Sequence, residues 1–214
     1  MADAATRGMR AMLVLLIVGC APSVVAEQRN DVGNTHVERA DASRARFRTG
    51  MRHHGDDLRY IDKLLRHGKL AEAQTIAFWL TRHEDPDVAL AARALLATTT
   101  LPAAHRVTAR VANACGGCHV RAGVPAFAFD PVAPRDDGSI DARLRRHRWA
   151  AARVWDGVVG ASEPQWRAGL EVFASDISGY RTHRIATHAL EGGYEDRATA
   201  YGELLVSCMA CHPR

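Results

Sequence analysis

The residues with the clearest chemistry in this 214-residue chain are four cysteines arranged in two pairs of identical spacing. Each pair reads C-x-x-C and is followed at once by histidine, as Cys115-Gly116-Gly117-Cys118-His119 and Cys208-Met209-Ala210-Cys211-His212. On a helix, cysteines three residues apart share a face, so both can add to the vinyl groups of one porphyrin while the next imidazole points toward the iron. This is the attachment signature of c-type haem. We therefore expect two covalently bound haems c, attached through Cys115, Cys118, Cys208 and Cys211 and ligated by His119 and His212.

Two other kinds of site use C-x-x-C pairs: thiol–disulfide enzymes and zinc sites. The first belongs in a βαβ context, which this sequence lacks, and zinc would require the two pairs to converge. Two copies with histidine at the same offset favour haem over both. No convergent nucleophile, carboxylate pair or further metal cluster is visible in the sequence, so we do not expect an enzyme.

The two motifs belong to an internal repeat of 93 residues, because Cys115, Cys118 and His119 each recur at that offset. An apolar series upstream of each motif recurs at the same offset: Phe47, Met51, His54, Leu58, Ile61 and Leu65, then Ile140, Leu144, His147, Ala151, Val154 and Val158. Spacings of three and four residues trace one face of a helix. Both faces carry histidine at the same step, which makes His54 and His147 counterparts.

The same periodicity predicts an all-α fold with four helices in each copy. The first copy has expected helices over 42–66, 69–82, 87–98 and from Pro102 to the haem motif, with stops near Gly68 and Pro86. The second has expected helices over 140–159, 163–174, 181–190 and 194–209, and Ser139 caps the first of them. Short loops indicate antiparallel packing. We expect two tandem four-helix bundles, at 36–122 and 139–214, each with its motif at the end of the last helix, joined by a Pro-rich linker at 123–138.

Each half resembles the cytochrome c prime family, whose members are four-helix bundles with C-x-x-C-H near the end of helix four. The resemblance extends over residues 40–122 and 139–214 and, outside the haem motifs, lies in the architecture. It implies one covalently bound haem in each half. Members of that family leave the sixth coordination position open beside an aliphatic side chain, so histidine at that position would be a departure from the family pattern.

The histidines on the first helices decide the sixth ligand. In an up-down bundle the start of helix one lies beside the end of helix four, so His54 and His147 should face the irons opposite His119 and His212. A buried imidazole needs a partner, because an unsatisfied buried polar group costs about 1–3 kcal/mol, and iron would be that partner. Two alternatives stay open: core histidines satisfied by another hydrogen bond, and a methionine ligand, Met51, in the first half alone.

The four tryptophans are expected in the bundle cores or against haem: Trp79, Trp149, Trp155 and Trp166.

The N-terminal segment predicts export. Arg7 and Arg10 precede an apolar run over 11–18, which is the layout of a signal peptide and is shorter than the roughly 20 residues that span a bilayer. Residues 17–20 resemble a lipobox, in which Cys20 would carry lipid and anchor the protein to a membrane, whereas residues 24–26 suit an ordinary signal peptidase. We expect a periplasmic protein whose signal peptide lies within residues 1–26. No later apolar run is long, which excludes a polytopic membrane protein.

Composition and charge narrow the partners. The apolar fraction of 47% is that of a globular protein, and a net charge of +4 from scattered residues does not indicate nucleic acid. The hypothesis is a periplasmic dihaem c-type cytochrome that carries electrons between redox partner proteins. Two alternatives are a gas-binding or sensing protein with open haem sites, and a dihaem peroxidase or reductase in which one iron is open.

Overall fold

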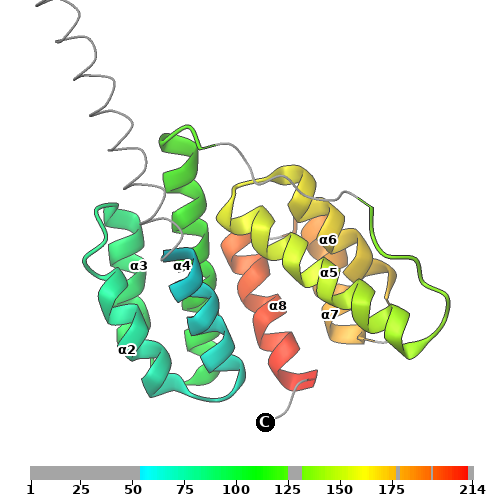
Figure 1. Cartoon of the computed structure of the whole chain (residues 1–214), viewed down its shortest axis with the longest axis horizontal. Coiled ribbons are helices and arrows are strands. Elements are labelled where there is room, and N and C mark those ends of the chain that lie inside the picture. The colour runs from blue at the N-terminus through cyan, green and yellow to red at the C-terminus, as the bar shows by residue number, and fades with distance from the viewer. Residues whose placement is uncertain (1–53, 125–131, 177–178, 194, 212–214) are drawn as a thin grey trace, which may run out of the picture. The chain divides into compact units, whose positions relative to one another are not determined.

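The computed structural model describes residues 54–124, 132–176, 179–193 and 195–211, and these residues form helices and connecting turns without any strand. The first helix covers 54–66 of the described chain and is followed by α2 (Leu70–Leu80), α3 (Pro86–Leu96) and α4 (Leu101–Arg121). The next four are α5 (Ile140–Val159), α6 (Glu163–Ser175), α7 (Tyr180–Leu190) and α8 (Arg197–Cys211) (Figure 1). The all-α prediction is confirmed. The predictions on the signal peptide, Cys20, Met51 and His212 lie outside the described residues.

Local chemistry accounts for where the helices begin and end. Gly68, at φ 74°, stops the first helix where the sequence predicts it, because its backbone adopts the left-handed conformation of a helix C-terminus. Ser139 caps α5 by accepting a hydrogen bond from the backbone N–H of Ala142 at 3.1 Å, as expected. The break expected at Pro86 is instead the first residue of α3, since proline suits a first helical turn and the Asp85 carboxylate caps it.

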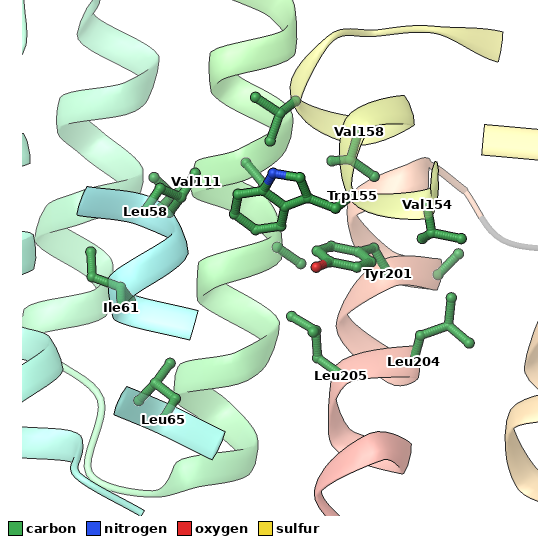
Figure 2. Close-up of a cluster of buried hydrophobic side chains, with 14 of the residues drawn as sticks. Leu58, Ile61, Leu65, Val111, Val154, Trp155, Val158, Tyr201, Leu204 and Leu205 are labelled. Carbon is green, nitrogen blue, oxygen red and sulfur yellow. The ribbon is translucent and has the colours of Figure 1, made fainter. Parts of the chain in front are cut away.

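Within each group of four, consecutive helices pack on one another: α2 on α3 and α3 on α4, then α5 on α6, α6 on α7 and α7 on α8. The two helices that carry the C-x-x-C-H motifs, α4 and α8, also pack on each other, and α4 packs on α5. One apolar core therefore continues from the first group into the second. Figure 2 shows it with side chains from the first helix, α4, α5 and α8: Leu58, Ile61, Leu65, Val111, Val154, Trp155, Val158, Tyr201, Leu204 and Leu205.

Helices α4 and α8 run antiparallel (Figure 1). Arg197, the first residue of α8, donates a hydrogen bond to the Gly157 carbonyl at 3.0 Å, near the end of α5, and that end also packs on the last part of α4. Further along α8, Gly202 lies against Arg106, near the start of α4, where an added Cβ would be 3.1 Å from the Arg106 Cα. The two motifs, each at the C-terminal end of its helix, are thus directed to opposite ends of this helix pair.

Two apolar features differ from expectation. In the described part of the first helix the apolar stripe is buried as predicted, at Leu58, Ile61 and Leu65. The stripe of α5 is buried only at Val154 and Val158: Leu144 is 49% exposed, Ile140 is 75% exposed, and Ala151 is also exposed. Trp79, expected in a core or against haem, is 60% exposed on the outer face of α2, so its assignment to the core is wrong. The guanidinium of Arg82 covers its ring at 5.3 Å, which is a cation–π arrangement.

Candidate haem-attachment sites

The first motif is positioned by close packing between α4 and the turn that ends α5. Gly116 faces this turn, and a Cβ added to Gly116 would lie 2.4 Å from the Val158 carbonyl oxygen. No larger residue fits there unless the backbone shifts. Gly117, the other residue between the two cysteines, faces outward and would meet only the end of the Arg121 side chain. The glycine at position 116 therefore lets the turn after α5 reach the motif.

This packing brings His119 to the end of α5. The imidazole of His119 donates a hydrogen bond to the backbone carbonyl of Val159, which raises its pKa, while burial has the larger effect and lowers it. A histidine that binds a metal through one ring nitrogen commonly donates its other N–H to a carbonyl, which holds the ring in one orientation. The contact of His119 with Val159 is of that kind.

Both thiols of the first motif are held in the protonated form. Burial, with Cys118 and Asp85 nearby, raises the pKa of Cys115 to about 12. Burial also raises the pKa of Cys118, whose thiol donates a hydrogen bond to the Asp85 carboxylate. The two cysteines form no disulfide in the described structure. Thiol–disulfide enzymes need a thiolate stabilised by its surroundings, and the surroundings of these two thiols do the opposite.

His54 lies at the same end of the first group of helices as the motif. Its ring is 4.6 Å from the ring of His83, measured between centroids. Nδ1 of His83 accepts a hydrogen bond from the backbone N–H of Asp85 at 2.9 Å, and Asp85 in turn contacts Cys118. The start of the first helix, the turn between α2 and α3, and the end of α4 therefore converge. The up-down arrangement predicts this convergence.

The hydrogen bonds distinguish the two histidines chemically. Because Nδ1 of His83 accepts a hydrogen bond, the proton of the neutral ring is on Nε2, so that nitrogen is a donor and not a metal ligand. Nδ1 of His54 is buried and has no hydrogen-bond partner in the described structure. A buried orphan nitrogen on this side of the motif fits a group that approaches from there.

The second motif has a comparable setting. The Thr182 and Ser207 hydroxyls are 2.9 Å apart and buried, and this contact joins the first turn of α7 to α8 one residue before Cys208. His147 packs edge-on against Phe173 of α6, with 5.1 Å between ring centroids. Cys208 is half-buried. Cys211 is the last residue of α8, but its side chain and His212 lie outside the described part of the structure.

The antiparallel packing separates the motifs. Gly202 of α8 contacts Arg106 of α4, and the two helices run in opposite directions from that contact. At a rise of 1.5 Å per residue, Cys118 and Cys208 therefore lie about 27 Å apart along the helix axes. A zinc site that uses both pairs would need them to converge, so this separation excludes it. Among the described residues, no group of three or more histidine, cysteine or acidic side chains is placed to hold a metal ion.

Sequence reasoning missed two residues beside the first motif. Asp85 contacts Cys118 and pairs with Arg121, and these contacts hold the pKa of its carboxyl near 2. His83 contacts His54. Neither has a counterpart in the second half: at the 93-residue offset His83 corresponds to Asp176 and Asp85 to Ser178, so the repeat gives no signal for them. The D-P pair at 85–86 is a recognisable helix-start signal and could have placed Asp85.

None of the helices in the described ranges has an apolar stretch long enough to cross a bilayer. Comparison of the chain with protein-family models, with curated proteins and with solved structures gives no match.

Proposed function

We propose that the chain is a dihaem c-type cytochrome that carries electrons between redox partner proteins in the periplasm, with no substrate chemistry of its own. The observation that carries this proposal is the duplicated C-x-x-C-H motif, placed in each half at the end of the last helix. A helix-one histidine lies in the same position of each repeat.

Several features of the described residues fit a haem at the first motif. His119 is oriented by the Val159 carbonyl, as a metal-binding histidine commonly is, and Nδ1 of His54 is buried without a hydrogen-bond partner in the described structure. In the second half, the exposed apolar residues Ile140 and Leu144 precede His147 by seven and three residues and so lie on the same side of α5. Such a stripe fits a large apolar ring, because uncovered apolar area costs free energy in water.

The chain's own residues would act in three ways. The four cysteines hold the cofactors covalently, so that they stay bound in dilute solution. His119 and His212 would bind the irons, and His54 and His147 would be further ligands to them, which would exclude small ligands. Haem, when bound, supplies one-electron chemistry at iron, and two imidazole ligands give it a lower reduction potential than a histidine–methionine pair.

The proposal is tested by the visible spectrum of the matured protein and two variants. Wild type should show ferric low-spin bands and no shift with carbon monoxide. His54→Ala should convert half of the haem to a high-spin form that binds carbon monoxide, and His147→Ala the other half. His67→Ala removes an exposed histidine without a repeat partner and should leave the spectrum unchanged.

A wild-type protein that is high-spin and binds carbon monoxide would contradict the electron-carrier proposal and favour gas binding. Turnover of peroxide with a reduced donor would favour the dihaem enzyme instead. Mass spectrometry of the mature protein measures the haem stoichiometry and, in the same spectrum, whether Cys20 carries lipid. A mass without two haems would remove the proposal altogether.

A further inference from the structure

A group of buried polar atoms without hydrogen-bond partners lies between the first helix and α4, away from both motifs. They are Oδ1 of Asp62, both ring nitrogens of His105 and Oγ1 of Thr108. His105 and Thr108 are fully buried, and Asp62 is 9% exposed. His105 and Thr108 are three residues apart on α4, so they share a face. Buried polar atoms in proteins are almost always bonded, and several orphans in one place indicate an internal ligand.

The atoms belong to one cluster because a single guanidinium influences all of its ionisable members. Arg66 pairs with Oδ2 of Asp62 at 2.9 Å, contributes to the low pKa of His105 and acts on Tyr201 of α8. Asp62 itself also acts on Tyr201. In Figure 2 the Tyr201 ring extends from α8 with its hydroxyl end toward α4, and Ile61 and Leu65 are on the side of the first helix.

The surroundings of the cluster are otherwise apolar and offer it few charges. On the first helix the charged member is Arg66, and on α4 the titratable member is His105. On α5 the contributing group is Asp156, whose two carboxylate oxygens pair with Arg59 at 3.7 Å and Arg153 at 2.8 Å. On α8 the contributing groups are Tyr201 and Cys208.

We propose that this cluster is a proton-binding site that contains internal water, and that Asp62 takes up a proton when a haem of the protein is reduced. The inference rests on the proposed function. The electron comes from the redox partner and converts ferric to ferrous iron. The proton comes from solvent and forms an O–H bond at Oδ1 of Asp62. Reoxidation reverses both steps, so the protein carries a proton together with an electron.

The position of the cluster relative to both candidate sites favours this coupling. Along the first helix Asp62 is about 12 Å from His54, and along α8 Tyr201 is about 10 Å from Cys208, at 1.5 Å per residue. An added electron at either iron makes the potential at the cluster more negative, and low-dielectric packing weakens that effect little. A negative potential favours the neutral carboxyl over the carboxylate. Burial already raises the pKa of Asp62, against the opposing effect of Arg66.

Internal water explains how the orphan atoms are satisfied in either state. Buried waters typically make about three hydrogen bonds to such groups. Burial and Arg66 hold the pKa of His105 at about 4, so its ring is neutral near pH 7 and offers one donor and one acceptor. When Asp62 is protonated, the neutral His105 ring can accept a hydrogen bond from internal water. When Asp62 is ionised, the same ring can donate a hydrogen bond to that water. Through Arg66, which is half-exposed, Asp62 is close to solvent for proton exchange.

The test is the pH dependence of the reduction potentials of the full, haem-loaded chain, measured by potentiometric titration from about pH 5 to about pH 9. In wild type the potential of at least one haem should fall as pH rises through the window between the pKa values of Asp62 in the oxidised and reduced protein. In Asp62→Asn that fall should be lost. Glu72→Gln removes an exposed carboxylate of α2 that pairs with Lys69 at 3.2 Å, away from the cluster, and is the control, which should keep the wild-type profile.

A second measurement does not depend on the variant folding. Reduced-minus-oxidised infrared difference spectra of wild type in light and heavy water should show a carboxylic-acid C=O band that appears on reduction and shifts in heavy water. An unchanged pH profile in Asp62→Asn, or the absence of such a band in wild type, overturns the proton site. A colourless chain overturns the proposed function instead, so the two failures are distinguishable.

Discussion

The two glycines inside the first C-x-x-C motif should respond in opposite directions to the same substitution. In Gly116→Ala the new Cβ would be 2.4 Å from the Val158 carbonyl oxygen, a backbone atom that can yield only if the turn after α5 moves. In Gly117→Ala the nearest atom is a guanidinium nitrogen of Arg121 at 3.3 Å, at the end of an exposed and flexible side chain. Both positions are inside α4, and neither substitution changes a haem-attachment residue.

The magnitudes follow from two competing effects. Replacing glycine by alanine within a helix stabilises by about 0.5–1 kcal/mol, so Gly117→Ala should gain that amount. Overpacking costs about 1–3 kcal/mol, so Gly116→Ala should be destabilised by about 1–2 kcal/mol after the helix gain is subtracted. The two variants should therefore differ by about 1.5–3 kcal/mol in the free energy of unfolding.

Urea unfolding followed by far-ultraviolet circular dichroism measures this difference as a change in midpoint at constant slope. The structure also predicts a spectroscopic effect, because a displaced turn would carry the Val159 carbonyl away from His119. Gly116→Ala should therefore perturb the spectrum of one haem, and Gly117→Ala should not. If both variants were stabilised alike, the packing of α5 against the motif described here would be incorrect.

Three further predictions concern local features. Ala161→Gly should raise the free energy of unfolding by about 0.5–1 kcal/mol in thermal or urea denaturation, because Ala161 has φ 49° and a Cβ is unfavourable there. Thr182→Val and Ser207→Ala should each cost about 1–3 kcal/mol by orphaning a buried hydroxyl, and the double variant should cost less than the sum of the two. Asp85→Ala should cost about 1 kcal/mol at neutral pH through loss of the α3 cap. The pKa of Asp85 is lowered from 3.8 to about 2, so the stabilisation from its ionised form is present above about pH 4 and is lost as pH falls toward 2. If Asp85→Ala lowered the free energy of unfolding by the same amount at pH 7 and at pH 2 in urea unfolding, this reasoning would be contradicted.

Local signals predicted helix ends well where nearby residues determine them. Ser139 and Gly68 act through their own side chain or backbone conformation, and α5 begins and ends where the periodicity places it. The packing of α4 against α8 could not be predicted in this way. It depends on the fit of Gly202 against Arg106, which are 96 positions apart and outside any periodic pattern.

The candidate site was predictable to the extent that it repeats. The recurrence at 93 residues singles out His54 and His147, and the structure places His54 at the same end of its helices as the first motif. Asp85 and His83 occur in one copy only, and His105 is a fully buried histidine without a repeat partner, so no sequence pattern points to them. The residue type of Trp79 does not predict its burial, because a large apolar side chain can lie on an outer face with an arginine guanidinium over its ring.

Because α4 and α8 run in opposite directions, the two motifs lie at opposite ends of this helix pair. With a haem at each end, as proposed, an electron donor could bind at one end while an acceptor is bound at the other. Neither partner would have to dissociate before the next electron is transferred. A duplication that kept the two motifs side by side would instead have placed both haems at one end, where they would hold two electrons together. If both irons are bound as proposed, this arrangement would suit electron transfer through the protein, and the rings of Trp155 and Tyr201, 6.2 Å apart between centroids, lie between α5 and α8 in that region.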